Sequence, residues 1–371
     1  MHTHAPDRLP GGESRARTYA GVVTSPAVPD LRSPLLDRPG AVAGEGLDSA
    51  VAAHYGDPMR EQRRLLAGEA VVDLSHRGVL QVSGPDRLSW LHSLTTARLT
   101  DLPPRRSAEA LILSPKGHVE HDLHLVDDGE TVWLIVEPGT AEAAAAWLDS
   151  MRFMLRVEVR DVTADFAVVG EVDDREWTEA DAPAVAAWVD RWPDLGDDTA
   201  SYSGDGPHPA QGRRWREVIV PREALTTYVG ERPLAGTWAA EAERVAAWRP
   251  RQGVDTDHRT IPHELDLLRT AVHLHKGCYR GQETVARVHN LGRPPRRLVF
   301  LHLDGSGHVL PEPGSDVMVP GNPRPVGRLT SVARHHEDGP IALALVKRST
   351  PVDADLQVGD VAAAQTVIVQ P

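Results

Sequence analysis

Cysteine, long apolar segments and an excess of positive charge are what this sequence lacks. Cys278 is the only cysteine among 371 residues, so no internal disulfide can form. A single thiolate also cannot hold an iron–sulfur cluster by itself, because such clusters normally take about four. No apolar run approaches the roughly 20 residues that span a bilayer, so no membrane contact is expected. Acidic residues outnumber Lys and Arg by 53 to 40, and the net charge of −13 argues against a broad nucleic-acid-binding face.

The first 45 residues differ in composition from the rest of the sequence. They mix Pro, Gly, Arg, Asp and His without apolar periodicity, which is typical of a flexible segment. They also lack the apolar core of a secretory signal. A lone cysteine suits a reducing compartment. These features predict a cytoplasmic protein with a flexible N-terminal tail over residues 1–45.

Hydrophobic patterning divides the remaining sequence into two parts. Strands are expected over 79–82, 111–113, 119–126, 131–136 and 155–159, and helices over 86–94, 141–148, 239–248 and 262–270. Strands that alternate with helices and are joined by hairpins predict an α+β arrangement, with a second such unit over 165–240. After Pro294 and Pro295, five short apolar segments separated by Gly and Pro predict a small all-β barrel or sandwich.

The lone cysteine lies in an unusual segment, residues 276–283, which reads KGCYRGQE. Gly277 and Gly281 permit a tight bend or the close approach of a ligand. Lys276, Arg280 and a helix expected over 282–288 would favour the thiolate form of the cysteine. Free cysteine is also commonly a small buried hydrophobe. From these residues alone, a functional thiol and a packing role both remain open.

A polar face is expected on the strand over 119–126. Glu120, Asp122 and His124 share this face, because side chains alternate along a strand. They fit either a general acid/base site in a cavity or the wet side of a half-exposed strand. His121 points the other way, so it cannot join His118 and His124 around a metal. His273 and His275 supply only two imidazoles where about three or four ligands are needed, and no metal site is predicted.

Residues 276–297 are locally basic, since six Lys and Arg residues face a single acid, Glu283. Such a segment can receive an anionic ligand such as the glutamate tail of a folate. On charge alone, a solvated basic loop is the favoured interpretation.

Several of these motifs together resemble a known family. The segment 276–283 is similar to the signature of the YgfZ-type folate-binding proteins, which are relatives of the T-protein, the aminomethyltransferase of glycine cleavage. Segments 75–86, 91–96, 114–119 and 327–331 resemble further parts of these proteins in the same order. The resemblance covers roughly residues 46–371 and is weakest over 165–240. It implies an aminomethyltransferase-like α+β fold, with two lobes within residues 46–296 and a C-terminal β-barrel over 297–371.

The resemblance also implies a function. It suggests a protein that binds tetrahydrofolate or a derivative and supports the assembly or repair of iron–sulfur clusters, with Cys278 as the acting thiol. Its partners would then be a reduced folate and iron–sulfur client or assembly proteins. The residues that it implies around the folate are Arg244, Lys276, Gly277, Tyr279, Gly281, Gln282 and Glu283.

Two departures from the T-protein pattern keep other functions open. T-proteins carry an acidic pair where this chain reads His121-Asp122, so only Asp122 remains as a catalytic candidate there. A glutamate of their helical Arg-Leu-Glu-Ala-Gly pattern is replaced by Ala246. The alternatives to cluster assembly are a folate-dependent aminomethyl or one-carbon transferase or demethylase, and a non-catalytic folate-sensing module.

Overall fold

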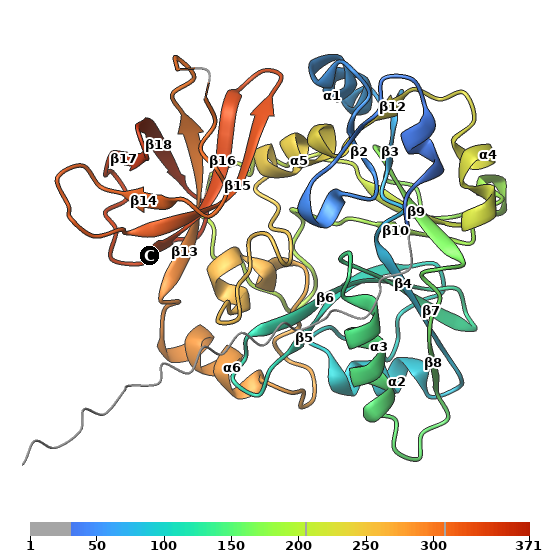
Figure 1. Cartoon of the computed structure of the whole chain (residues 1–371). Helices are drawn as coiled ribbons and strands as arrows, with labels where there is room; N and C mark the ends of the chain where they lie inside the picture. Colours follow the sequence, from blue (N-terminus) through green and yellow to red (C-terminus); the bar gives the residue numbers. More distant parts are fainter. Residues whose placement is uncertain (1–30, 205, 308) are drawn as a thin grey trace, which may run out of the picture.

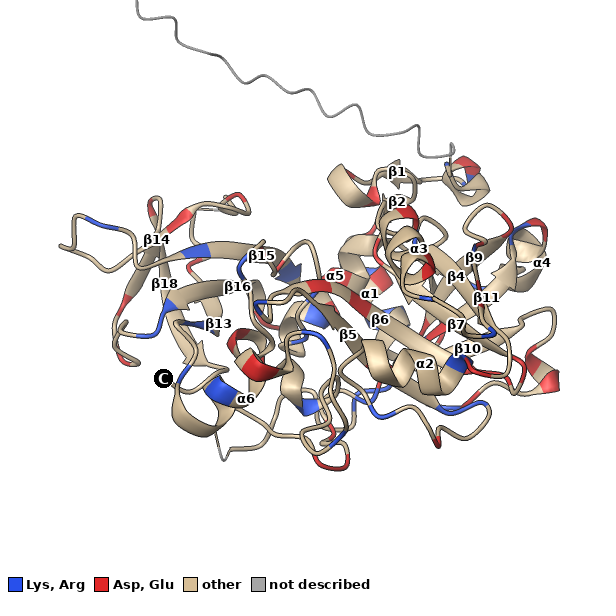
Figure 2. Ribbon diagram, turned by 90° about the horizontal axis from the view of Figure 1, so that it is seen from below, with Lys and Arg blue, Asp and Glu red and all other residues tan. Residues whose placement is uncertain are grey.

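The computed structural model describes residues 31–204, 206–307 and 309–371. Figure 1 shows three lobes, of which two are built on five-stranded sheets and the third is a closed barrel. In the described part of the chain, no helix combines the length and the apolarity that a bilayer crossing requires. Acidic and basic positions are interspersed over all three lobes (Figure 2).

The first lobe carries an antiparallel sheet in the strand order β5-β6-β7-β4-β8. Leu91, Leu134 and Leu148 are fully buried between this sheet and its two helices. The predicted strands and helices of this region are confirmed, although the last strand begins at Glu158 and not at residue 155. The elements are β4 (Gly78–Ser83), α2 (Arg87–Leu94), β5 (Ser107–Leu113), β6 (Val119–Asp127), β7 (Thr131–Val136), α3 (Ala141–Ser150) and β8 (Glu158–Asp161).

The second lobe carries a mixed sheet in the order β10-β11-β9-β3-β12. The short strand β3 (Val71–Asp73) precedes the whole first sheet in sequence, yet it pairs in parallel with β12 (Leu234–Ala235). The predicted unit over 165–240 is therefore completed by residues that come before residue 75. The other elements are η1 (Pro34–Asp37), β1 (Val42–Ala43), η2 (Gly46–Asp48), β2 (Ala52–His54), α1 (Pro58–Leu66), β9 (Phe166–Glu171), η3 (Glu179–Asp181), β10 (Ala186–Val189), β11 (Arg216–Pro221), η4 (Arg222–Ala224) and α4 (Leu225–Val229).

The prediction of a flexible tail over residues 1–45 is wrong for residues 33–45, which are folded. Leu35 in η1 is 0% exposed and belongs to the apolar core of the second lobe. Ser33 caps η1 with its side chain, and its backbone N–H donates to the carbonyl of Ala50. Residues 33–45 are thus part of the folded lobe, because their few apolar side chains find partners that are distant in sequence. Residues 1–30 of the expected tail lie outside the described residues.

The C-terminal barrel is confirmed and closes in the order β13-β16-β15-β14-β17-β18. The predicted helix over 262–270 is instead two short 3-10 helices, because Asp266 adopts a left-handed conformation with φ of 59° and breaks the helical run. The elements after the second lobe are α5 (Thr237–Ala246), η5 (Pro262–Leu265), η6 (Leu267–Arg269), α6 (Gln282–Leu291), β13 (Arg296–Leu303), β14 (Asp316–Met318), β15 (Gly327–His335), β16 (Gly339–Lys347), β17 (Leu356–Val358) and β18 (Val361–Val367).

Helix α5 lies where the three lobes meet. It packs against α1 and β2 on one side and against the barrel strands β15 and β16 on the other. Figure 1 shows it between the barrel and the second lobe. Residues on and just after this helix therefore line the centre of the molecule.

Candidate functional site

A small polar cavity of about 60 Å³ lies at the centre of the molecule, where side chains from the two sheets and from α5 converge. The first sheet contributes Asp122 and His124 from β6, and the second contributes Trp188 from β10 and Glu217 from β11. Helix α5 and the segment after it add a cluster of arginines. The charged side chains that line the cavity are Asp48, Arg77, Asp122, Glu137, Asp190, Arg213, Glu217, Glu241, Arg244, Arg249 and Arg251.

Asp122 has the most unusual environment of the predicted site residues. Burial, followed by the nearby Glu109 carboxylate, raises the pKa of Asp122 to about 7. Its Oδ1 atom has no hydrogen-bond partner among the described residues. A carboxyl group that can hold or release a proton near neutral pH, with one oxygen uncommitted, is suited to general acid/base chemistry.

Glu109 supplies a second acid that the sequence analysis missed. In the β5–β6 hairpin, Glu109 is opposite His124 and Leu111 is opposite Asp122, so Glu109 and Asp122 are diagonal neighbours. Ligand atoms of Glu109, Asp122 and His124 all lie within 4.8 Å of one another. Glu109 therefore provides a second carboxylate beside Asp122, where the T-protein pattern would have had one at His121. The hairpin register was the sequence signal that could have revealed it.

His124 is held firmly in this group. Its Nδ1 atom is 2.8 Å from Glu217 Oε2, and its ring stacks on Trp188 at 3.7 Å between centroids. Burial opposes the charged imidazolium, but the Glu217 carboxylate outweighs that effect and raises the pKa of His124. The predicted polar face of β6 is confirmed for Asp122 and His124, which share the cavity. Glu120 does not line it and instead pairs with Arg280 at 2.9 Å.

Arg244 lines the cavity, but its guanidinium is fully engaged within the protein. Its five hydrogen bonds go to Glu241 twice, Asp255, Ser331 and the carbonyl of Arg249, and a guanidinium has about five donors in all. Arg244 therefore ties α5 to the barrel and leaves no donor for a folate. Arg77 offers a hydrogen-bond donor to the cavity instead, because its buried Nε atom has no partner among the described residues.

The signature segment lies elsewhere, since none of residues 276–283 lines the central cavity. Cys278 is exposed, so the packing role is excluded and the thiol is accessible. The flanking cations Lys276 and Arg280 were expected to favour the thiolate of Cys278, but both have other partners. The Lys276 ammonium donates to the carbonyls of His92, Thr95 and Ala97 at the end of α2, and burial lowers the pKa of Lys276 to about 8. Arg280 is engaged with Glu120.

Gly281 allows two motifs that are distant in sequence to pack on one another. Its φ is +84°, and a Cβ atom there would lie 2.6 Å from the carbonyl oxygen of Ser114. The signature segment therefore packs on the turn at 114–118, which only glycine permits.

The other residues of the segment that were predicted to contact a folate differ in how far they are buried. Tyr279 is buried in the main apolar cluster, together with residues of β5 and the barrel. Gly277 and Glu283 are exposed, and Glu283 pairs with Arg287 across one turn of α6. Gln282 is the first residue of α6 and is partly exposed.

A larger cavity of about 750 Å³ adjoins the central one. Trp188 borders both cavities, and Glu109 lines the larger one. Its far wall includes His273, three residues before Lys276. This cavity therefore borders Glu109 at one point and the residues just before Lys276 at another, while none of residues 276–283 lines it.

The basic segment over 276–297 is not a free cationic surface. Arg296 pairs with Asp257 and Glu264, and the buried Arg297 donates to the carbonyl of Thr350 and to Gln365 Oε1. Lys276, Arg280 and Arg287 are also engaged, as described above. Most of its charge is therefore engaged within the protein.

Asp122 gives this protein a testable pH dependence. Between about pH 4 and about pH 7 the native carboxyl keeps a proton that the unfolded chain has released, so its contribution to stability is lost as the pH rises through this window. An Asp122→Asn variant cannot titrate. Its melting temperature relative to wild type should therefore increase from about pH 4 to about pH 8. A difference between the two proteins that stays constant with pH would show that Asp122 ionises as an ordinary carboxyl.

Comparisons with known proteins agree with this architecture. The GCVT N-terminal domain family matches residues 35–170. The structure of the glycine cleavage aminomethyltransferase T from Bartonella henselae superposes with a TM-score of 0.69 at 18% identity, over 91% of this chain and 95% of that one. The predicted aminomethyltransferase-like fold is thereby confirmed.

Sequence relatives fall into two named groups. An aminomethyltransferase of Moorella thermoacetica is 28% identical over 80% of this chain and 83% of its own. A mitochondrial iron–sulfur cluster assembly factor IBA57 homologue of Chaetomium globosum is 26% identical over 85% of this chain and 71% of its own.

A chloroplast protein of Arabidopsis thaliana, which bears the provisional name of a transferase, is 28% identical over 71% of this chain. The matched region spans only 62% of that relative's length. The matching domain family over residues 35–170 and these relatives show that the chain is related to the GcvT aminomethyltransferases and to the IBA57-type iron–sulfur cluster assembly factors.

Proposed function

We propose that this protein binds a reduced folate and supports the assembly or repair of iron–sulfur clusters, with Cys278 as the acting thiol. The observation that carries the proposal is the position of this thiol. The only cysteine of the sequence lies within the signature segment and is exposed to solvent. The chain also aligns with proteins that are named as cluster assembly factors. An exposed thiolate is a suitable transient ligand for the iron of a cluster in transit to a client protein.

The polar groups of the central cavity suit a folate, but its volume alone does not. Asp122 Oδ1 and Arg77 Nε are an unpartnered acceptor and donor in one buried site, as a pteridine ring requires. The cavity of about 60 Å³ is far below the roughly 300–1,000 Å³ of small-molecule sites. The neighbouring cavity of about 750 Å³ has the necessary room. A folate would thus occupy the larger cavity and reach Asp122 past Trp188 and Glu109.

A one-carbon transferase is the second candidate, and the pair of Glu109 and Asp122 favours it. Two buried carboxyl groups whose environment raises one pKa toward neutrality form a typical acid/base arrangement. The role of Asp122 would be to hold and release a proton beside the bound folate. A folate-sensing module without chemistry would need neither this pair nor the exposed thiol.

Folate binding should be measurable directly on the full chain. Tetrahydrofolate at a hundredfold excess over its dissociation constant should stabilise the native state by about 2.7 kcal/mol, seen as a higher melting temperature. Calorimetry should give one site per chain. The p-aminobenzoyl-glutamate fragment is the matched control, because it lacks the pteridine that Asp122 and Arg77 would contact. Absence of heat and of a thermal shift at millimolar tetrahydrofolate would remove folate from the proposal.

The role in cluster assembly is tested in a strain that lacks the protein. Enzymes that contain iron–sulfur clusters should lose activity there, and expression of the wild-type chain should restore it. Enzymes without clusters should be unaffected. Equal activity of cluster enzymes with and without the protein would favour the transferase.

A further inference from the structure

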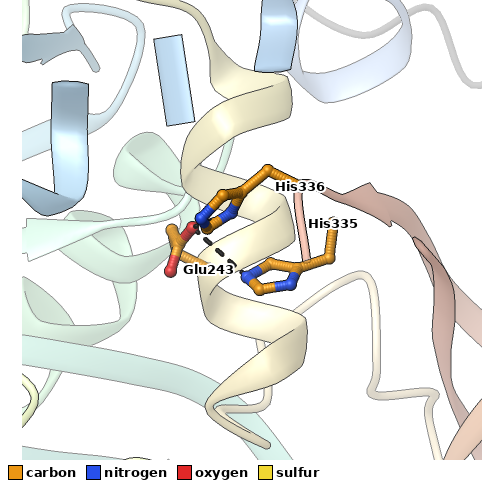
Figure 3. A group of neighbouring side chains, drawn as sticks. All are labelled: Glu243, His335 and His336. Atoms are coloured by element: carbon orange, nitrogen blue, oxygen red, sulfur yellow. Dashed lines mark ion pairs between the residues drawn. The ribbon is translucent and has the colours of Figure 1, made fainter. Parts of the chain in front are cut away.

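A second group of potential ligands lies outside the central cavity, between α5 and the barrel. Figure 3 shows the imidazoles of His335 and His336 beside the carboxylate of Glu243. His335 ends β15 and His336 begins the turn to β16, while Glu243 comes from the last turns of α5. One ligand atom from each of the three lies within 4.8 Å of the other two.

The atoms of this group are buried and incompletely satisfied. The side chains of His335, His336 and Glu243 are only 8%, 7% and 15% exposed. Glu243 Oε1 and His336 Nδ1 have no hydrogen-bond partner among the described residues. An unpartnered buried acceptor facing an unpartnered buried imidazole nitrogen costs free energy unless something else joins them.

The separations suit an ion better than direct hydrogen bonds. Glu243 Oε1 is 3.5 Å from His335 Nε2 and 3.9 Å from His336 Nδ1. A direct N–H···O bond would need about 2.7–3.2 Å. Ligands at about 2.0–2.2 Å from a tetrahedral zinc ion are roughly 3.3–3.6 Å apart, so a small side-chain adjustment would place all three around one ion.

Carboxylates also stand behind both imidazoles. Asp338 Oδ2 is 3.1 Å from His335 Nδ1, and Glu337 Oε1 is 3.7 Å from His336 Nε2. Carboxylates in this position orient metal-bound histidines and accept the proton of the other ring nitrogen. Without an ion, His335 Nδ1 can instead accept from the backbone N–H of Asp338, also at 3.1 Å. His335 Nδ1 therefore has a hydrogen-bond partner both with and without a bound ion.

We propose that Glu243, His335 and His336 form a binding site for one divalent first-row transition metal ion, of which Zn²⁺ is the simplest probe. Two imidazoles and one carboxylate are typical ligands of such ions and leave at least one position open for water or another ligand. The ion would link α5 to the β15–β16 hairpin. That hairpin also contacts α1, since the backbone N–H of His336 donates to Gln62 and the side chain of Gln62 donates to the carbonyl of Arg334. The site is independent of the folate and cluster proposals.

The test is zinc titration of the full chain in a Cys278→Ser background, which removes the only thiol. After treatment with EDTA and dialysis, calorimetry should show one Zn²⁺ per chain, and zinc should raise the melting temperature. Glu243→Gln and His336→Ala should each weaken binding at least tenfold and abolish the thermal shift. Asp338→Asn, at a half-exposed position, should weaken binding by about 10- to 100-fold while the fold is kept.

His302→Ala is the matched control, because it removes an exposed barrel histidine outside the group. It should bind zinc like the parent. Failure of the parent to bind zinc above the His336→Ala level would overturn the proposal. So would zinc binding that persisted in His336→Ala and disappeared in Asp122→Asn, since the ion would then lie with Glu109, Asp122 and His124 in the central cavity.

Discussion

A Cys278→Ser variant should fold like wild type and fail to restore iron–sulfur enzyme activity in a strain that lacks the protein. The replacement is nearly isosteric at an exposed position, so no packing is lost. It removes the only thiol of the chain, and the serine hydroxyl is not deprotonated at neutral pH and binds iron poorly. Rescue should therefore fall to the level of an empty vector, while the melting temperature and the cellular amount of protein stay unchanged.

Ala286→Ser is the matched control for this variant. It adds the same hydroxyl to an exposed position of α6, close to the signature segment, and should rescue fully. Full rescue by Cys278→Ser would exclude thiol chemistry. If Asp122→Asn then abolished function while folate binding was kept, the one-carbon transferase would become the better reading. Loss of function in Cys278→Ser alone supports cluster assembly.

An Arg249→Met variant should lose about 3–5 kcal/mol of unfolding free energy at neutral pH, because a buried charge cluster would lose its cation. The Arg249 side chain is 5% exposed and donates to Glu109 at 2.9 Å and to Asp190 at 3.3 Å. Glu109 comes from the first sheet and Asp190 follows β10 of the second, so the guanidinium joins the two lobes. Methionine fills similar volume but leaves Glu109 buried without a cation, while Asp190 keeps Arg213 as its one remaining ion-pair partner. Denaturant unfolding monitored by tryptophan fluorescence measures the change.

Arg98→Met provides the comparison, since Arg98 pairs with Asp101 at the surface, where both side chains are more than half exposed. Its unfolding free energy should change little, because solvent screens such a pair. The loss of unfolding free energy in Arg249→Met should also be smaller at acidic pH, because the carboxylates that have lost this cation take up protons. Equal effects of the two substitutions would mean that the central network does not hold the lobes together.

Local patterns in the sequence were sufficient for much of the fold. The strands of the first sheet, helices α2, α3 and α5, and the barrel were all predictable because period-2 and helical patterns, Pro and Gly report on residues that are neighbours in sequence. The signature at 276–283 identified the family for the same reason, since it is one short continuous segment. The limits of the N-terminal region were not predictable in this way. Leu35 is buried in a core made mostly of residues that come more than a hundred positions later, such as Val169 and Val218.

The chemistry of the candidate site was decided by the tertiary structure. Arg244 was expected to face a folate, yet all its donors are used within the protein. Lys276 was expected beside the thiol, yet its ammonium donates to backbone carbonyls at the end of α2.

The sequence by itself determined which residue types are present: one thiol, the acids and histidines of β6, and a basic signature segment. Only the tertiary structure decided their partners, because it brings Glu109 to Asp122 across a hairpin and Arg249 to Glu109 across 140 positions. Charge, burial and hydrogen bonding act through space, so the same residues become a proton-holding pair, a structural clamp or an exposed thiol according to what the fold places beside them.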